Sequence, residues 1–151
     1  MRIYGRIETA FWQNPKIRPL HEDARLLLVY LFSCPHGNSL GCFILPIPYI
    51  GSDLQWDEKR VSKRVSELVS AGFLDRDDKT ALTRIVGWFG HNSIDNGKVA
   101  KGAATILAKL PRCQTFFNLI NELEKAGNRF LNPYLFEYRN GYRNTVEPPE
   151  P

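Results

Sequence analysis

The sequence lacks the features of membrane, secreted and disulfide-stabilised proteins. No apolar run approaches the roughly 18 residues that a membrane-spanning helix needs, and residues 1–6 lack the apolar stretch of a signal peptide. Only three cysteines occur, Cys34, Cys42 and Cys113. An odd number of cysteines at irregular spacing argues against a disulfide framework. We therefore expect a protein that stays in the cytoplasm and has no membrane partner.

Signals of catalysis and metal binding are also scarce. The chain has no Gly-rich phosphate loop, no nucleophile elbow and no His-Glu-x-x-His helix. Cys34, His36 and Cys42 offer three zinc ligands, but no fourth ligand follows at a regular spacing, and Cys42 lies in an apolar stretch. We therefore expect no enzyme activity, no catalytic residue, no metal site and no cofactor.

The overall composition is that of a globular protein with a mild excess of positive charge. Hydrophobic residues make up 43% of the 151 residues and charged residues 24%, so the chain can bury a core without metal or disulfide support. Its 20 Lys and Arg exceed its 16 Asp and Glu, which gives a net charge of +4. This excess permits a polyanionic partner without requiring one.

Hydrophobic periodicity and helix breakers predict a mainly α-helical fold with one small β-hairpin. In the clearest helix, Val61, Val65 and Leu68 recur at helical spacing, and Gly72 is placed to end it. Helices are predicted near 22–33, 48–54, 57–71, 98–110 and 114–126, with a short strand over 42–45 and a hairpin near 73–87.

The order of elements from Pro48 to Gly87 is short helix, turn, longer helix and hairpin. This order is typical of a winged helix-turn-helix, in which the second helix lies in the DNA major groove. The predicted fold is a winged helix-turn-helix with extra C-terminal helices. We expect a winged-helix domain over 1–92, a helical and aromatic extension over 93–142 and a disordered tail over 143–151.

The outward face of the helix 57–71 carries cations separated by short hydroxyls, which suit phosphate contacts and base-edge hydrogen bonds. Acids at the predicted wing tip, Asp75, Asp77 and Asp78, disfavour a phosphate contact there, so Arg84 on the second strand is the better candidate. The predicted DNA-binding residues are Lys59, Arg60, Ser62, Lys63, Arg64 and Arg84. The alternative is an ordinary solvated helix face.

A second basic cluster begins with Lys98 and Lys101 and continues to Lys109 and Arg112 without an intervening acid. Lys98 and Lys101 are candidates for a secondary basic track along DNA. The alternative is again the solvated face of a helix.

The segment 130–142 is rich in large apolar side chains that are costly to leave in water. They are Phe130, Leu131, Tyr134, Leu135, Phe136, Tyr138 and Tyr142. They are expected to pack either on Phe116, Phe117 and Ile120 of the helix 114–126 or across a homodimer interface. The dimer is favoured, because helix-turn-helix dimers bind paired half-sites.

Several stretches of the chain look like parts of one family. They are 11–20, 23–28, 41–46, 53–56, 66–74, 88–92, Asn96 and 99–103. In their order they resemble the small winged-helix proteins encoded beside replication genes in phages and prophages, similar to the N-terminal domains of DnaD-like replisome organisers. The resemblance covers about residues 6 to 110. It implies a winged helix, no catalytic residues, and a role in replication initiation or helicase loading.

The expected function is therefore double-stranded DNA binding in phage replication initiation or replisome organisation, with a replicative helicase or helicase loader as a further partner. Two alternatives remain open. In one, the winged helix is a scaffold for protein–protein interaction, with a helicase-loading partner or a second copy of the chain. In the other, the protein is a transcriptional regulator.

Overall fold

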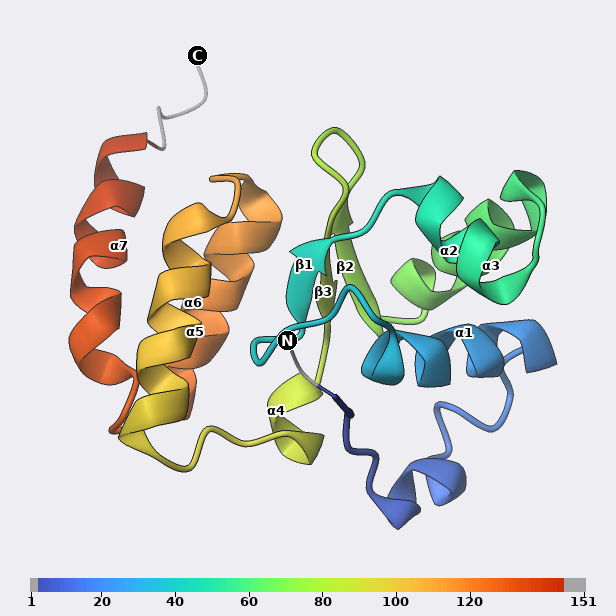
Figure 1. Ribbon diagram of the computed structural model, residues 1–151, viewed down its shortest axis with the longest axis horizontal. Helices are drawn as coiled ribbons and strands as arrows, with labels where there is room; N and C mark the ends of the chain where they lie inside the picture. The colour runs from blue at the N-terminus through green and yellow to red at the C-terminus, as the bar shows by residue number, and fades with distance from the viewer. Residues whose placement is uncertain (1–2, 146–151) are drawn as a thin grey trace. The chain divides into compact units, whose positions relative to one another are not determined.

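The computed structural model describes residues 3–145, with side chains up to residue 138 (Figure 1). The chain divides into two compact units, Met1–Ser93 and Ile94–Pro151. The first unit contains a 3-10 helix, four α-helices and three strands within the described residues. They are η1 (Thr9–Gln13), α1 (Glu22–Ser33), β1 (Cys42–Ile44), α2 (Ile47–Leu54), α3 (Glu58–Ser70), β2 (Leu74–Asp77), β3 (Leu82–Ile85) and α4 (Trp88–His91).

The predicted winged helix-turn-helix is confirmed by the element order and by the sheet. The hairpin β2–β3 follows α3, and β1 joins it as a third strand in the antiparallel order β1-β3-β2. The short strand predicted over 42–45 is thus the third strand of the wing sheet. The short helix α4 is an element that the sequence analysis did not predict.

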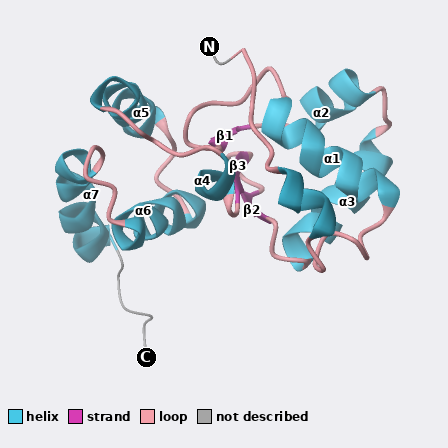
Figure 2. Cartoon of the chain, turned by 90° about the horizontal axis from the view of Figure 1, so that it is seen from below, coloured by secondary structure: helices cyan, strands magenta, loops and turns pink. Residues whose placement is uncertain are grey.

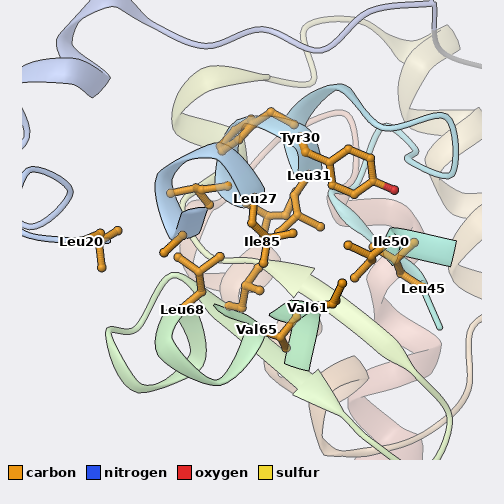
Figure 3. Packing of buried hydrophobic residues seen from close by; sticks show 14 of the residues in the cluster. Leu20, Leu27, Tyr30, Leu31, Leu45, Ile50, Val61, Val65, Leu68 and Ile85 are labelled. Atoms are coloured by element: carbon orange, nitrogen blue, oxygen red, sulfur yellow. The ribbon is translucent and has the colours of Figure 1, made fainter. Parts of the chain in front are cut away.

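The core of the first unit lies between α1, α3 and the sheet (Figure 3). Leu27 and Leu31 of α1 contribute to it, as do Val61 and Leu68 of α3 at the predicted helical spacing. Ile85 of β3 belongs to the same buried cluster. Helix α3 contacts α1, α2 and β2, so one of its faces is fixed inward and the opposite face is turned to solvent.

A tight turn sets the angle between α2 and α3. Gln55 ends α2 in the left-handed conformation, with a φ of 58°. The backbone N–H of Trp56 then donates to the carbonyl oxygen of Gly51 at 3.0 Å. A Cβ on Gly51 would lie only 2.8 Å from the Trp56 carbonyl oxygen, so this approach requires glycine. Asp57 caps α3 by accepting from the Arg60 backbone N–H at 2.8 Å.

The N-terminal arm is fastened to the end of the first unit by one buried side chain. Asn92 is 4% exposed. Its Oδ1 accepts from the backbone N–H of Arg6 at 2.9 Å, and its Nδ2 donates to the carbonyl oxygen of Arg6 at 3.0 Å. The backbone N–H of Glu8 also donates to His91 Nδ1 at 2.9 Å. The backbone N–H and C=O of Arg6 are thus both hydrogen-bonded to the side-chain amide of Asn92.

The second unit contains the helices α5 (Gly97–Lys109), α6 (Gln114–Ala126) and α7 (Asn132–Thr145), which neighbour one another in Figure 2. The predicted helices 98–110 and 114–126 are confirmed as α5 and α6. Asn96 caps α5 by accepting from the Val99 backbone N–H at 2.9 Å. Helix α6 packs on α7.

The C-terminal segment differs from the sequence-based expectation. Asn132-Pro133 and Asn140-Gly141 are pairs that commonly mark turns, yet both lie within α7. Pro133 lies in its first turn, where a missing N–H breaks no helical hydrogen bond. The predicted disordered tail is wrong for 143–145, which also belong to α7, and 146–151 lie outside the described residues.

Three apolar side chains in or just before α7 pack within the chain. Leu131, Leu135 and Tyr138 are buried, and the Tyr138 ring meets the Phe116 ring edge-on, with 5.5 Å between their centroids. The predicted packing on the helix 114–126 is therefore present. Phe136, on the opposite side, is 66% exposed, and the side chain of Tyr142 lies outside the described residues.

Candidate nucleic-acid interface

The solvent face of α3 carries two lysines one helical turn apart. Lys59 and Lys63 are exposed, and in the described part of the chain neither forms an ion pair. Ser62 is half-buried and Ser66 is exposed beside them. This face is opposite Val61, Val65 and Leu68, as a helical step of ~100° per residue predicts.

One of the two acids of α3, Glu67, is held by structural hydrogen bonds. Glu67 accepts from the His21 backbone N–H at 3.0 Å and from Arg64 Nη1 at 2.8 Å. The hydrogen bond from His21, followed by that from Arg64, holds the pKa of Glu67 below its usual value. Glu58 is exposed in the first turn, where a carboxylate favours the helix N-terminus. Positive charge therefore dominates the face beyond the first turn.

Arg60 has a different role from its lysine neighbours. Its Nε and Nη2 each donate to a carboxylate oxygen of Asp23 on α1, at 2.9 Å. Its guanidinium also lies over the Trp56 ring, 4.2 Å from the centroid. The hydrogen bond from Arg60 lowers the pKa of Asp23. Asp23 thus balances the charge of Arg60, whose side chain remains 46% exposed and connects α3 to α1.

The guanidinium groups of Arg64 and Arg84 are both held in ion pairs. Arg64 lies at the border of the buried face of α3, 14% exposed, and binds Glu67. Arg84 lies directly opposite Asp75 in the wing register, is 12% exposed and donates to Asp75 Oδ2 at 3.1 Å. Neither is a free cation for a phosphate. The interface expected from the sequence is thus reduced at these two positions.

The wing tip is not basic. Arg76 turns inward and donates from Nη1 to the Leu45 carbonyl oxygen at 2.7 Å and to Thr83 Oγ1 at 2.6 Å. Burial lowers its pKa, and the neighbouring Asp78 opposes that effect. The sequence analysis missed this role, although the two-residue period of a strand places Arg76 on the same face as the buried Leu74. Asp78 itself is exposed at the tip.

The possible second basic track lies on the solvent face of α5. Lys98 and Lys101 are exposed, and so are Gly102 and Thr105 between the turns of the same face. Neither lysine forms an ion pair with any residue whose side chain the structure describes. This face belongs to the second unit.

His36, one of the three side chains that the sequence offers as zinc ligands, has another partner. His36 Nε2 lies 3.0 Å from Asp53 Oδ2, the same oxygen to which the Tyr30 hydroxyl donates. Burial, and then the hydrogen bond to Asp53, raises the pKa of Tyr30. Within residues 3–138, no group of three or more His, Cys, Asp and Glu side chains is arranged to hold a metal ion. None of the described helices is long and apolar enough to cross a membrane.

Comparisons of the chain with protein-family models, with curated proteins and with solved structures gave no match.

Proposed function

We propose that this chain is a cytoplasmic protein that binds double-stranded DNA, with α3 in the major groove. The observation that carries the proposal is the solvent face of α3. It is the second helix of the helix-turn-helix, and it presents Lys59 and Lys63, which form no ion pair with any described side chain. Helices of this position and width fit the major groove.

The side chains of this face divide into two roles. Lys59 and Lys63 are mobile point charges that suit phosphate oxygens, whereas the hydroxyls of Ser62 and Ser66 suit base edges or backbone oxygens. Arg60 acts by positioning, because its bonds to Asp23 hold the first turn of α3 against α1. The affinity is then mainly electrostatic and falls steeply as salt rises.

The process that we propose is replication initiation or replisome organisation, with a replicative helicase or its loader as a protein partner. Its support is the resemblance of the stretches 11–20, 41–46 and 66–74 to phage-encoded winged-helix replication proteins.

A protein–protein interaction module is the second candidate, and the wing favours it. Asp78 is almost fully exposed at the wing tip, where a carboxylate repels phosphate, and Arg76 is turned inward. In that function the lysines of α3 are solvated and their removal leaves the biological partner bound.

The test measures binding to a duplex of about 20 base pairs, or two helical turns, by fluorescence anisotropy over a salt series. The variant Lys59→Gln/Lys63→Gln should weaken binding at low salt. It should also reduce the slope of log affinity against log salt by up to about 2, since each phosphate contact contributes about 0.9. The control Lys125→Gln/Arg129→Gln removes the same charge from exposed residues in the last turn of α6 and just after it.

Two results would contradict the proposal. One is an unchanged affinity and slope in the α3 variant. The other is an equal loss in the control, which shows attraction by net charge alone rather than by α3.

A further inference from the structure

An apolar groove lies on the outer side of α1, away from α3. One wall is Trp12 of η1, and the other is a stripe on α1 formed by Glu22, Arg25, Leu26 and Val29. In Figure 1 the two walls are the blue segments η1 and α1. The groove encloses about 260 Å³, less than the roughly 300–1,000 Å³ of typical small-molecule sites. It has room for one or two side chains.

Two large apolar side chains that line this groove are exposed to solvent, although α1 is the central helix of the core. Trp12 is 58% exposed and Leu26 is 50% exposed, although their neighbours Phe11 and Leu27 are buried. The buried Phe11 ring meets the Trp12 ring edge-on, with 5.1 Å between centroids, and so anchors the residue next to the exposed indole. The packing of Phe11 therefore fixes the position of Trp12, and the groove is present without a ligand.

Arg25, which lines the groove, has a buried polar atom without a hydrogen-bond partner. The Nε of Arg25 is inaccessible to solvent, and it has no hydrogen-bond partner. Nor does Arg25 form an ion pair with any described residue. A buried donor without an acceptor costs about 1–3 kcal/mol, and more for a charged group. A carboxylate that binds the guanidinium of the half-exposed Arg25 would balance a charge that no described residue balances.

The charges around the groove agree with an acidic occupant. The loop between its two walls carries Lys16 and Arg18, both exposed and, within the described part of the chain, without an ion pair. Of the acids at the start of α1, Asp23 is neutralised by Arg60. Glu22 is the remaining free acid, so unpaired cations outnumber unpaired acids here.

We propose that this groove binds a peptide segment of a partner protein in which a large apolar side chain stands next to an Asp or Glu. The apolar side chain lies between Trp12 and Leu26, and the carboxylate accepts hydrogen bonds from the Arg25 guanidinium. The site lies on η1 and α1 and is separate from the solvent face of α3. It is independent of whether α3 binds DNA.

The probes are acetylated and amidated peptides GSxEySG, in which x and y are Leu, Phe or Trp, with matched peptides that carry Gln or Lys in place of Glu. They are titrated into the full chain, and two-dimensional NMR follows the indole N–H of Trp12 and the amides of residues 22–29. We expect shifts at these signals and an affinity for the best Glu peptide about tenfold above that of its Gln match, the value of one charged hydrogen bond.

Three variants at exposed or half-exposed positions sharpen the test. Arg25→Gln should bind Glu and Gln peptides equally. Leu26→Ser should weaken all peptides while keeping the Glu preference. Lys63→Gln, the control on α3, should bind the peptides as the parent chain does.

Three outcomes overturn the inference. The first is equal affinity for all Glu and Gln pairs, and the second is a set of shifts outside η1 and α1. The third is a homodimer in sedimentation that Leu26→Ser dissociates, since a second copy then fills the groove. Duplex binding by Arg25→Gln is measured in parallel. If Arg25→Gln keeps its DNA affinity and loses the preference for Glu peptides, the result supports the groove as a site distinct from the α3 face. If it loses DNA affinity and keeps that preference, the result counts against the groove.

Discussion

Arg60 on α3 and Asp23 on α1 form an ion pair with two hydrogen bonds, in which Nε and Nη2 each lie 2.9 Å from a carboxylate oxygen. The pair joins the proposed DNA-binding helix to the central helix of the core. It also removes Arg60 from the set of free cations on α3. Asp23 therefore has two opposite effects: it holds α3 in place, and it reduces the positive charge of the proposed interface.

The first prediction concerns this pair. Asp23→Ala and Arg60→Ala should each lower the urea concentration at the unfolding midpoint, and the double variant should lose less than the sum of the two. In duplex binding the two changes should act in opposite directions. Asp23→Ala frees the Arg60 charge and should raise affinity at low salt, whereas Arg60→Ala should not. Additive losses of stability would show that the pair does not couple α1 to α3.

The second prediction is a loss of stability in acid. Asp23, Glu67 and Asp77 all have pKa values lowered by hydrogen bonds in the folded chain, from ordinary values of 3.8, 4.5 and 3.8. Their contribution is complete above those ordinary values and is lost as the pH falls through the lowered ones. The free energy of unfolding should thus decline between about pH 5 and about pH 2.

The acid prediction is checked by urea unfolding over a pH series. Asp23→Asn should flatten the decline, because the amide does not titrate, while lowering stability at neutral pH. Asp95→Asn serves as the control, since this residue is exposed and forms no ion pair with any described residue, and it should leave the decline as it is. A profile that Asp23→Asn does not alter would be incompatible with the lowered pKa of Asp23.

The third prediction concerns the wing. Ala81 adopts a φ of 62°, a conformation that costs residues with a Cβ about 1–2 kcal/mol. Ala81→Gly should raise the free energy of unfolding by about 0.5–1 kcal/mol, because the gain exceeds the extra freedom of glycine in the unfolded chain. Ala108→Gly, in the exposed face of α5, should lower it by a similar amount. Equal destabilisation by Ala81→Gly and Ala108→Gly would contradict the positive φ of Ala81.

The fourth prediction uses two neighbours on α7. Leu135 is fully buried, so Leu135→Ala should cost about 2–5 kcal/mol of unfolding free energy. Phe136 is largely exposed, and Phe136→Ser should change stability by less than about 0.5 kcal/mol. Thermal unfolding combined with sedimentation measures both stability and mass. A dimer that Phe136→Ser dissociates would place the homodimer interface on the outer face of α7.

The parts of the fold that follow from local patterns could be predicted from the sequence. Asp57 before Val61, Val65 and Leu68 marks both the start and the buried face of α3, because capping and helical period act within a few residues. Gly127 ends α6 for a similar local reason. The lysines of the α3 face follow from the same period.

The parts that depend on contacts between distant residues could not be predicted in this way. The pairing of Arg60 with Asp23 spans 37 positions, and no local pattern signals it. The pairing of Arg84 with Asp75 depends on the register of the wing, which the sequence alone did not specify. In α7, the pair Asn132-Pro133 is a local turn signal, but burial of Leu135 and Tyr138 against α6 favours a helix over this tendency.

The hydrogen bonds between Asn92 and the backbone of Arg6 limit how far the chain can be shortened from its N-terminal side. Removing the first eight residues would delete no helix or strand that the structure describes, although the partly buried Ile7 packs against the core. It would also remove the two hydrogen bonds that the backbone of Arg6 makes with the buried amide of Asn92, each worth about 0.5–1.5 kcal/mol. The smallest part of the chain that keeps the first unit intact must therefore begin before Arg6, well ahead of its first helical turn.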